Sequence, residues 1–200
     1  MTPSTESKDY STRLEVIQDK PWKKMLGALN PYRVHIRRVL NAPGLEVGCG
    51  IGRVLGFAAN DILGVDHNAH SIEICRNRGL HAMTSDEFFA DKSSHIDRYQ
   101  TLIFSHVLEH MTATQAKELV SMYMPFVKPG GKLVLICPQE KGYASDETHI
   151  EFLDEASLVG IAEAAGFKCQ SRYSYPFPRA FGKWFIYNES VVIAVKAVVE

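Results

Sequence analysis

The sequence has little net charge, few cysteines and no long apolar run, and each of these shortages excludes a class of protein. Lys+Arg number 22 and Asp+Glu 23, so the formal net charge is −1, which argues against the basic surface of a general nucleic-acid-binding protein. The apolar stretches, such as 133–137 and 191–195, fall far short of the roughly 20 residues that span a membrane. We therefore expect neither nucleic acid nor a membrane as a partner.

Cysteine usage indicates a reduced compartment. The four cysteines include no C-x-x-C pair, which excludes the closely spaced thiolates of a zinc or redox motif. The first residues also lack the apolar core of a signal peptide. We expect a cytoplasmic protein, and both a monomer and a homodimer stay open.

The composition that is present is that of one globular domain, with 46% hydrophobic and 22% charged residues. We expect a leader and a helical cap over 1–40 and the main domain over 41–200. Between Lys20 and Leu45 there is no acidic residue. Within this stretch, Pro31 favours the first turn of a short basic helix over 32–40, with Asn30 as its cap.

Strand-like and helix-like segments alternate along the main domain. The expected strands cover 45–47, 62–65, 80–84, 99–104, 132–137, 167–173 and 191–195, with a turn at 128–131. Helices are expected at 53–59, 68–78, 112–126 and 154–166. This alternation predicts an α/β fold with a doubly wound, mostly parallel seven-stranded Rossmann-like sheet. The last two strands have no helix between them, so we expect an antiparallel edge.

The most informative segment is the turn between the first strand and the first helix of this domain. It carries glycine at every second position, as Gly48, Gly50 and Gly52, which lets backbone N–H groups approach a ligand closely. Arg53 stands where the G-x-G-x-x-G dinucleotide motif needs glycine. The sequence therefore disfavours an NAD-dependent reductase.

A carboxylate follows at the end of the second strand. Asp66 comes fourteen residues after Gly52, and in open α/β sheets ligands bind outside the carboxyl ends of the strands. A carboxylate at that edge can accept both hydrogen bonds of a ribose diol. Asp66 is therefore a candidate ligand-binding residue.

These segments together resemble the class I S-adenosylmethionine-dependent methyltransferases, particularly small single-domain enzymes that act on small molecules. The resemblance covers about 44–138 and depends on the motifs at 46–52, 64–66, 105–110 and 127–131. It implies S-adenosylmethionine as cofactor, with its methionine end on the glycine loop and its amino group near Glu46. The implied cofactor-binding residues are Glu46, Gly48, Cys49, Gly50, Gly52, Asp66, His67, Ser85, Asp86 and Ser105.

The resemblance also implies contacts to the ribose, the sulfonium and the adenine. Asp66 would bind the ribose with His67 beside it, and Ser105 would line the wall near the sulfonium. Ser85 and Asp86, in a turn after the third strand, would meet the adenine, although the family typically has Gly-Asp there. The resemblance implies methyl transfer to a small-molecule acceptor, with a hydroxyl on a sugar or secondary metabolite as first choice. A non-catalytic S-adenosylmethionine-binding protein is the alternative.

Histidines supply the candidate catalytic groups. His106 or His110 could act as a general base if the acceptor carries a proton that must leave. His149, in the loop after the fifth strand, is the other candidate catalytic residue beside His106. The segment 106–110 also reads H-x-x-E-H, which keeps open a zinc hydrolase through His106 and His110. That chemistry needs both rings on one helix face, whereas this segment directly follows a strand. We therefore expect no metal, and His110 as a structural hydrogen-bonding group.

The candidate substrate-binding residues come from three separate segments: Tyr32, Arg33, Arg37, Glu140, Tyr143 and Arg179. Loops at strand ends usually carry such contacts. An ordinary solvated helix face and an ordinary polar loop are the competing interpretations. The aromatic-rich segment 173–187 could form a wall over the acceptor, a dimer contact or part of the core.

Overall fold

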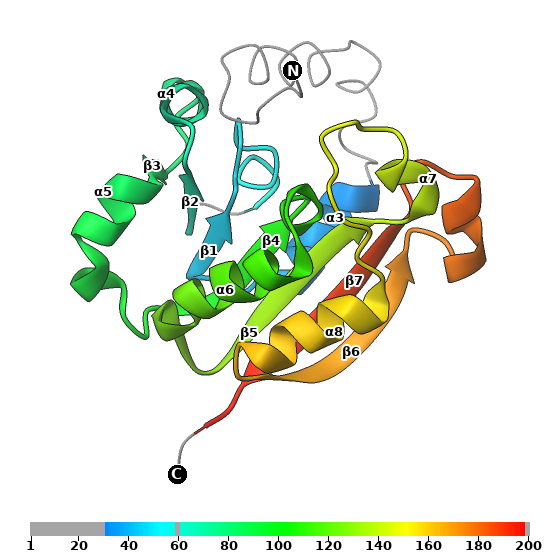
Figure 1. The fold of residues 1–200 in the computed structure, drawn as a ribbon. Helices are drawn as coiled ribbons and strands as arrows, with labels where there is room; N and C mark the ends of the chain where they lie inside the picture. Colours follow the sequence, from blue (N-terminus) through cyan, green and yellow to red (C-terminus); the bar gives the residue numbers. More distant parts are fainter. Residues whose placement is uncertain (1–30, 59–60, 199–200) are drawn as a thin grey trace.

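The computed structural model describes residues 31–58 and 61–198, and these form a single seven-stranded sheet in the order β3-β2-β1-β4-β5-β7-β6 (Figure 1). Strands β1 to β5 pair in parallel, and β7 runs antiparallel between β5 and β6. The predicted fold class is therefore confirmed, including its antiparallel edge. The strands are β1 (Gly44–Val47), β2 (Ile62–Asp66), β3 (Ala82–Thr84), β4 (Tyr99–Ser105), β5 (Val127–Pro138), β6 (Phe167–Tyr175) and β7 (Glu189–Lys196).

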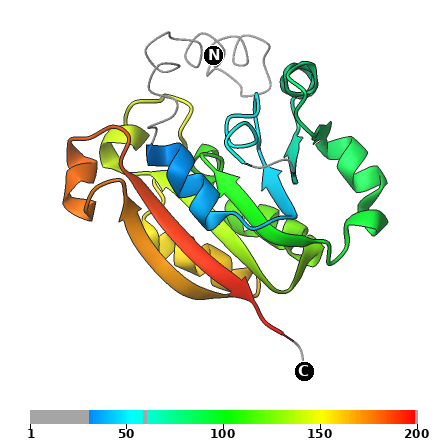
Figure 2. The same cartoon turned by 180° about the vertical axis from the view of Figure 1, so that it is seen from behind.

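Helices cover both faces of the sheet. α6 and α8 lie on the face toward the viewer in Figure 1, and α3 crosses the opposite face, as Figure 2 shows. Side chains of adjacent strand residues point to opposite faces, so Leu102 and Leu133 pack with α6 and α8 while Ile103 and Val134 pack with α3. The α-helices are α3 (Pro31–Val39), α4 (Ala69–Asn77), α5 (Ser85–Ala90), α6 (Ala113–Tyr123), α7 (Glu140–Tyr143) and α8 (Glu155–Ala164).

Several helices begin where the sequence predicts a cap. The Asn68 side chain accepts hydrogen bonds at the start of α4, and Asp154 does the same at α8. Thr112 and Gln115 form the reciprocal capping box of α6, which satisfies two backbone donors that a helix end leaves free. The predicted helix after Pro31 is confirmed as α3. Its predicted cap, Asn30, lies outside the described residues.

Three local predictions were wrong. Over the described residues 53–58 the chain forms turns instead of a helix, and hydrogen bonds to the third and fourth preceding residues mix there, as from Phe57 and Ala58 to Val54. Gly56 within the segment weakens helix propensity. The predicted turn at 128–131 is an irregular part of β5, because Tyr99 pairs with Val127 and Thr101 with Lys132.

The third correction concerns Ser85 and Asp86. They begin helix α5 instead of forming a turn, because Thr84 and Glu87 make a second capping box there. The predicted division into 1–40 and 41–200 stays a prediction, since 1–30 lie outside the described residues.

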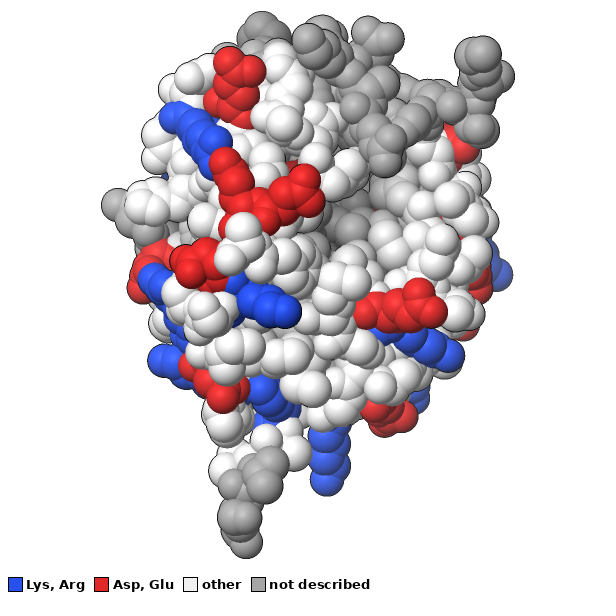
Figure 3. Space-filling view, turned by 60° about the vertical axis from the view of Figure 1, so that its left-hand side comes forward, with Lys and Arg blue, Asp and Glu red and all other residues white. Residues whose placement is uncertain are grey.

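The surface carries both charges in mixture. Acidic and basic side chains lie interspersed over the face shown in Figure 3, in keeping with the net charge of −1. Among the helices that the structure describes, none has the length and apolar character needed to cross a membrane.

Candidate active site

The carboxyl ends of β1, β2 and β4 meet at one edge of the sheet, the upper one in Figure 1. The glycine loop follows β1, Asp66 ends β2 and Ser105 ends β4. The strand order turns from β1 to β2 on one side and to β4 on the other, and such a switch point is where open α/β sheets bind ligands. Most of the predicted cofactor-binding residues are therefore brought to one place.

The glycine loop needs its glycines. Gly48, Gly50 and Gly52 have φ values of 73°, 51° and 80°, a backbone region that other residues rarely adopt. A Cβ on Gly48 would collide with Val107, and one on Gly52 would lie 2.5 Å from Leu80 Cδ1. The loop is therefore a tight turn beside Val107, and the N–H groups of Gly48 and Gly50 donate to Val65 O and Asp66 Oδ2.

Glu46 lies buried beneath this loop. Glu46 is only 2% exposed, and no described residue donates a hydrogen bond to its Oε2. Burial, together with the nearby Cys75 and Asp66, raises the pKa of Glu46 well above its usual range. A buried carboxyl oxygen without a donor is costly, and a cationic ligand group would satisfy it.

Asp66 is tied to the glycine loop through its carboxylate. Its Oδ2 accepts a hydrogen bond from the Gly50 N–H at 2.8 Å, and its Oδ1 accepts one from Asn68 N–H at 2.8 Å. His67 Nδ1 lies 3.5 Å from Oδ1, on a half-exposed ring. Each carboxylate oxygen has a second lone pair, so Asp66 can still accept two hydrogen bonds from a diol.

Helix α3 covers the end of β4. The Tyr32 hydroxyl lies 2.6 Å from Ser105 Oγ, and burial raises the pKa of Tyr32. The Arg53 guanidinium stands 4.4 Å from the centre of the Tyr32 ring, a cation–π contact. Tyr32 thus lies at the predicted site, where its hydroxyl connects α3 to the end of β4. Sequence reasoning missed Arg53, which it used only to exclude a dinucleotide motif.

His106 stands between two acidic residues. Its Nε2 lies 2.8 Å from Glu189 Oε1, and its Nδ1 lies 3.4 Å from Glu109 Oε1. Burial works against the imidazolium, but the two carboxylates outweigh it and raise the pKa of His106 to about 10. At neutral pH the ring is a cation whose N–H groups face carboxylates. Glu189 comes from β7, and nothing in the sequence pattern connected it to this site.

His110 and His149 form a second group with Glu109. His110 Nδ1 lies 3.2 Å from the Thr148 carbonyl oxygen, and His149 Nδ1 lies 2.7 Å from that of Tyr143. His110 thus makes the structural hydrogen bonds expected of it. The H-x-x-E-H segment does not form one helix face, because β4 ends at Ser105 and only 108–110 form a 3-10 turn, η3 (Leu108–His110). A zinc hydrolase would need His106 and His110 on one helix face, and this described segment does not place them so.

Most of the remaining predicted substrate residues have partners of their own. Glu140 and Arg179 form a bidentate ion pair, with distances of 2.7 and 2.6 Å. Tyr143 stacks on the His149 ring at 5.3 Å. Arg37 donates to the Phe57 carbonyl at 2.7 Å, and Arg33 is half-buried on α3. Of the six predicted residues, Tyr32 contacts Ser105 and Tyr143 contacts His149, whereas Glu140 and Arg179 pair with each other.

Comparison with protein families identifies the family of this chain. Residues 36–172 match the family described as a methyltransferase domain, which is more than half of the 200 residues. The chain belongs to this family. The match confirms the resemblance found in the sequence, and with it a methyltransferase that uses S-adenosylmethionine.

Solved methyltransferase structures share the fold. One from Archaeoglobus fulgidus has a TM-score of 0.66 at 18% identity, over 87% of this chain and 94% of its own. Magnesium protoporphyrin IX methyltransferase from Synechocystis, with bound S-adenosylmethionine, gives 0.63 at 15%, over 96% and 93%. A TehB-like methyltransferase from Corynebacterium glutamicum gives 0.65 at 16%, over 95% and 100%. A search of curated proteins returned no match.

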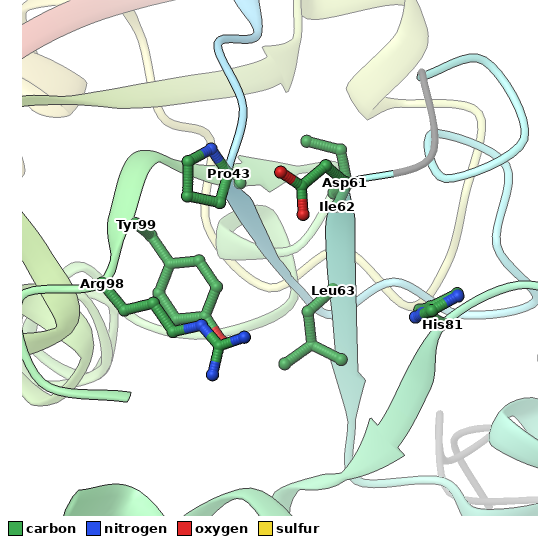
Figure 4. A pocket seen from close by; sticks show the side chains of 8 residues that line it. Pro43, Asp61, Ile62, Leu63, His81, Arg98 and Tyr99 are labelled. Atoms are coloured by element: carbon green, nitrogen blue, oxygen red, sulfur yellow. The ribbon is translucent and has the colours of Figure 1, made fainter. Parts of the chain in front are cut away.

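A cavity at the other edge of the methyltransferase sheet is distinct from this site. It has a volume of about 260 Å³ and lies at the amino-terminal ends of β1, β2 and β4, where Gly44, Ile62 and Tyr99 begin the strands (Figure 4). Asp61, His81 and Arg98 add polar groups to its wall. Because ligands of such sheets bind at the opposite strand ends, this cavity is not where methyl transfer is expected.

Proposed function

We propose that this methyltransferase acts on a hydroxyl group of a small molecule, such as a sugar or secondary metabolite. The observation that supports this most strongly is the arrangement at the end of β4, where His106 is held by Glu189 and Glu109 next to the Tyr32–Ser105 pair. These hydroxyl, carboxylate and imidazole groups can hydrogen-bond a polar acceptor. An apolar carbon acceptor would have no polar atom with which to bond them.

The cofactor side is assigned to the strand ends of β1 and β2. S-adenosylmethionine, when bound, supplies a methyl group on a positively charged sulfur that a nucleophile can displace in line. Glu46 would receive the amino group, because its buried Oε2 has no donor among the described residues. Asp66 would bind the ribose, and the backbone of the glycine loop would hold the methionine end. Ser85 and Asp86, at the adjacent end of β3, are proposed to face the adenine.

The acceptor side is assigned to His106 and His149. His106 orients the acceptor, since holding acceptor and methyl group in line is what lowers the barrier most. His149 donates its Nδ1–H to the Tyr143 carbonyl. The lone pair of the neutral ring is then on Nε2, which can accept the proton that leaves a hydroxyl group. Glu140, Arg179, Arg33 and Arg37 are proposed to shape the entrance for an anionic or polar acceptor.

The test is transfer of a labelled methyl group from S-adenosylmethionine to fractions of a metabolite extract. The proposal expects label in a small polar molecule, bound through a linkage that survives mild alkali, as a methyl ether does and a methyl ester does not. Label in an ester, in protein or in nucleic acid would contradict it. Binding of S-adenosylhomocysteine without any transfer would indicate a non-catalytic cofactor-binding protein. We further propose that it acts in the cytoplasm, as a monomer or homodimer.

A further inference from the structure

Three potential metal ligands come together beside the acceptor side of the site. Glu109, His110 and His149 each offer one ligand atom, and these three atoms lie within 4.8 Å of one another. Glu109 and His110 come from η3, and His149 comes from the segment after α7. No sequence pattern indicates this grouping, because His149 is far along the chain from the H-x-x-E-H segment.

Both rings are held in the tautomer that metal ligation needs. A carbonyl oxygen can only accept a hydrogen bond, so Nδ1 of His110 and Nδ1 of His149 carry the protons that they donate to Thr148 and Tyr143. The lone pair of each neutral ring is then on Nε2. Metal-bound histidines almost always donate their other N–H to a carbonyl or carboxylate in this way.

The third ligand is a buried carboxylate. Glu109 is only 1% exposed, and within the described part of the chain no hydrogen bond reaches its Oε1. This oxygen lies 4.0 Å from His149 Nε2 and 3.4 Å from His106 Nδ1. Glu109 Oε1 therefore lies between the His106 ring on one side and His149 Nε2 on the other. A metal ion bound between Glu109 and His149 would take one ligand atom from each.

We propose that Glu109, His110 and His149 bind one divalent transition-metal ion of the Zn²⁺ type. Two imidazole nitrogens and one carboxylate oxygen are the ligands of catalytic zinc, with ligand bonds of about 2.0–2.2 Å, and a fourth position stays open. Imidazole ligands do not suit Mg²⁺ or Ca²⁺, which prefer oxygen. This site differs from the zinc-peptidase pattern read in the sequence, because His149 takes the place of His106.

The ion would also refine the role of His149. Resting on the proposed function, an ion on His149 Nε2 would act in place of the bare ring by binding the acceptor hydroxyl and lowering its pKa. The Thr148 hydroxyl, 3.1 Å from His110 Nδ1 and donating to Asp146, would hold the ligand ring in place. The metal site itself does not depend on methyl transfer.

Metal binding is tested on the tag-free full-length chain, stripped with chelator and titrated with ZnSO₄ in a calorimeter. We expect one Zn²⁺ per chain, the same stoichiometry by elemental analysis, and the visible absorption of four-coordinate Co²⁺ after CoCl₂ addition. MgCl₂ should give no binding at the same concentration. Absence of stoichiometric Zn²⁺ binding would overturn the proposal.

Variants identify the ligands. His149→Ala and Glu109→Gln should each lower Zn²⁺ affinity at least 100-fold, and Thr148→Val should lower it about 10-fold. His81→Ala, which removes a histidine at the opposite edge of the sheet, and Cys75→Ser, which removes a buried thiol, should leave it unchanged. Zinc binding that survives in His149→Ala, or is lost in Cys75→Ser, would contradict the site.

Binding of S-adenosylhomocysteine, measured on the same samples, keeps this test separate from the proposed function. His149→Ala should bind it as the unmodified chain does, which also shows that the variant is folded. Loss of zinc binding with cofactor binding intact assigns the ion to these ligands. Zinc binding in a chain that binds no cofactor would uphold the metal site and refute the proposed methyl transfer.

Discussion

At the scale of single residues, the site depends on buried carboxyl groups whose hydrogen bonds are incomplete. Glu46 and Glu109 are buried carboxyl groups with an oxygen that lacks a hydrogen bond from any described residue. Folding a group this way costs free energy, and such costs are typical of positions that a ligand completes. We propose Glu46 and Asp66 for the cationic and diol parts of the cofactor, while Glu109 faces His106 and His149.

Glu46→Gln tests the buried carboxyl. Because the folded-state pKa of Glu46 is raised, its contribution to the free energy of unfolding is fully present below the unfolded pKa of about 4.3 and is lost as pH rises toward the folded pKa. The glutamine does not ionise, so we expect the variant to gain stability over the unmodified chain from pH 4 to pH 8. Urea unfolding at several pH values measures this.

The same variant should bind S-adenosylhomocysteine more weakly, by roughly 10-fold, because the amide cannot pair as strongly with the amino group. Cofactor affinity that is unchanged in Glu46→Gln would remove Glu46 from the site. A stability difference that is constant with pH would show that the carboxyl does not titrate as its burial requires.

His106 gives a second prediction at this scale. His106 has a φ of 57°, and asparagine tolerates that conformation better than most residues, so His106→Asn removes the ring with little backbone strain. We expect turnover to fall about 100-fold while S-adenosylhomocysteine affinity changes less than about 3-fold, since positioning and proton-transfer groups have effects of this size. Glu189→Gln, which removes the charge that holds the ring, should lower turnover in the same direction.

Initial rates with labelled cofactor, compared with calorimetric affinities, separate the two effects. A His106→Asn protein with full turnover would exclude the ring from the reaction. Loss of cofactor affinity equal to the loss of turnover would instead place His106 on the cofactor side.

At the scale of elements, α3 completes the site by covering the end of β4. Tyr32→Phe removes only the hydroxyl that bonds Ser105 across 73 residues of sequence. We expect the free energy of unfolding to fall by about 1 kcal/mol, the usual net contribution of one hydrogen bond. The Arg53 contact with the ring stays, so the helix should remain docked. Thermal unfolding measures the change.

Tyr173→Phe is the matched control, because its hydroxyl bonds His35 of the same helix at 2.7 Å, away from Ser105. Both variants should lose stability to a similar extent, but only Tyr32→Phe should change turnover. Equal turnover in the two variants would show that α3 is only structural cover.

The elements themselves were largely predictable from the sequence. Strong local signals, such as the Asn68 cap, the Thr112–Gln115 capping box and the apolar run that forms β5, gave the right element within a few residues. The turns over 53–58 were not predictable in this way. The apolar residues of this segment favour a helix, whereas Gly56 weakens one. Helix α5 was not predicted, because it has only six residues and follows directly on the end of β3, where a turn was expected.

The candidate site was predictable only in its local parts. The glycine loop, Asp66 and Ser105 each follow a strand end, so periodicity and spacing find them. The contact between His106 and Glu189 spans 83 residues and exists because β7 inserts antiparallel beside β5. The neighbours of His149 likewise depend on how a loop folds back on η3. No one-dimensional pattern contains these pairings.

At the scale of the whole molecule, the two edges of the single sheet have different features. One edge presents the glycine loop, Asp66 and the β4 end, and the opposite edge holds the cavity with Asp61, His81 and Arg98. This separation provides an internal control, because carboxylates at the two edges can be removed one at a time. We expect only the edge with the glycine loop to bind the cofactor.

The most direct measurement is calorimetric titration of S-adenosylhomocysteine into the full-length chain and into Asp66→Ala and Asp61→Ala. We predict one binding site in the unmodified chain and in Asp61→Ala. Asp66→Ala should bind with about 2–4 kcal/mol less free energy, a loss of roughly 30- to 1000-fold in affinity, because two hydrogen bonds to a charged group disappear. Equal affinity in Asp66→Ala, or no binding by the unmodified chain, would contradict the account.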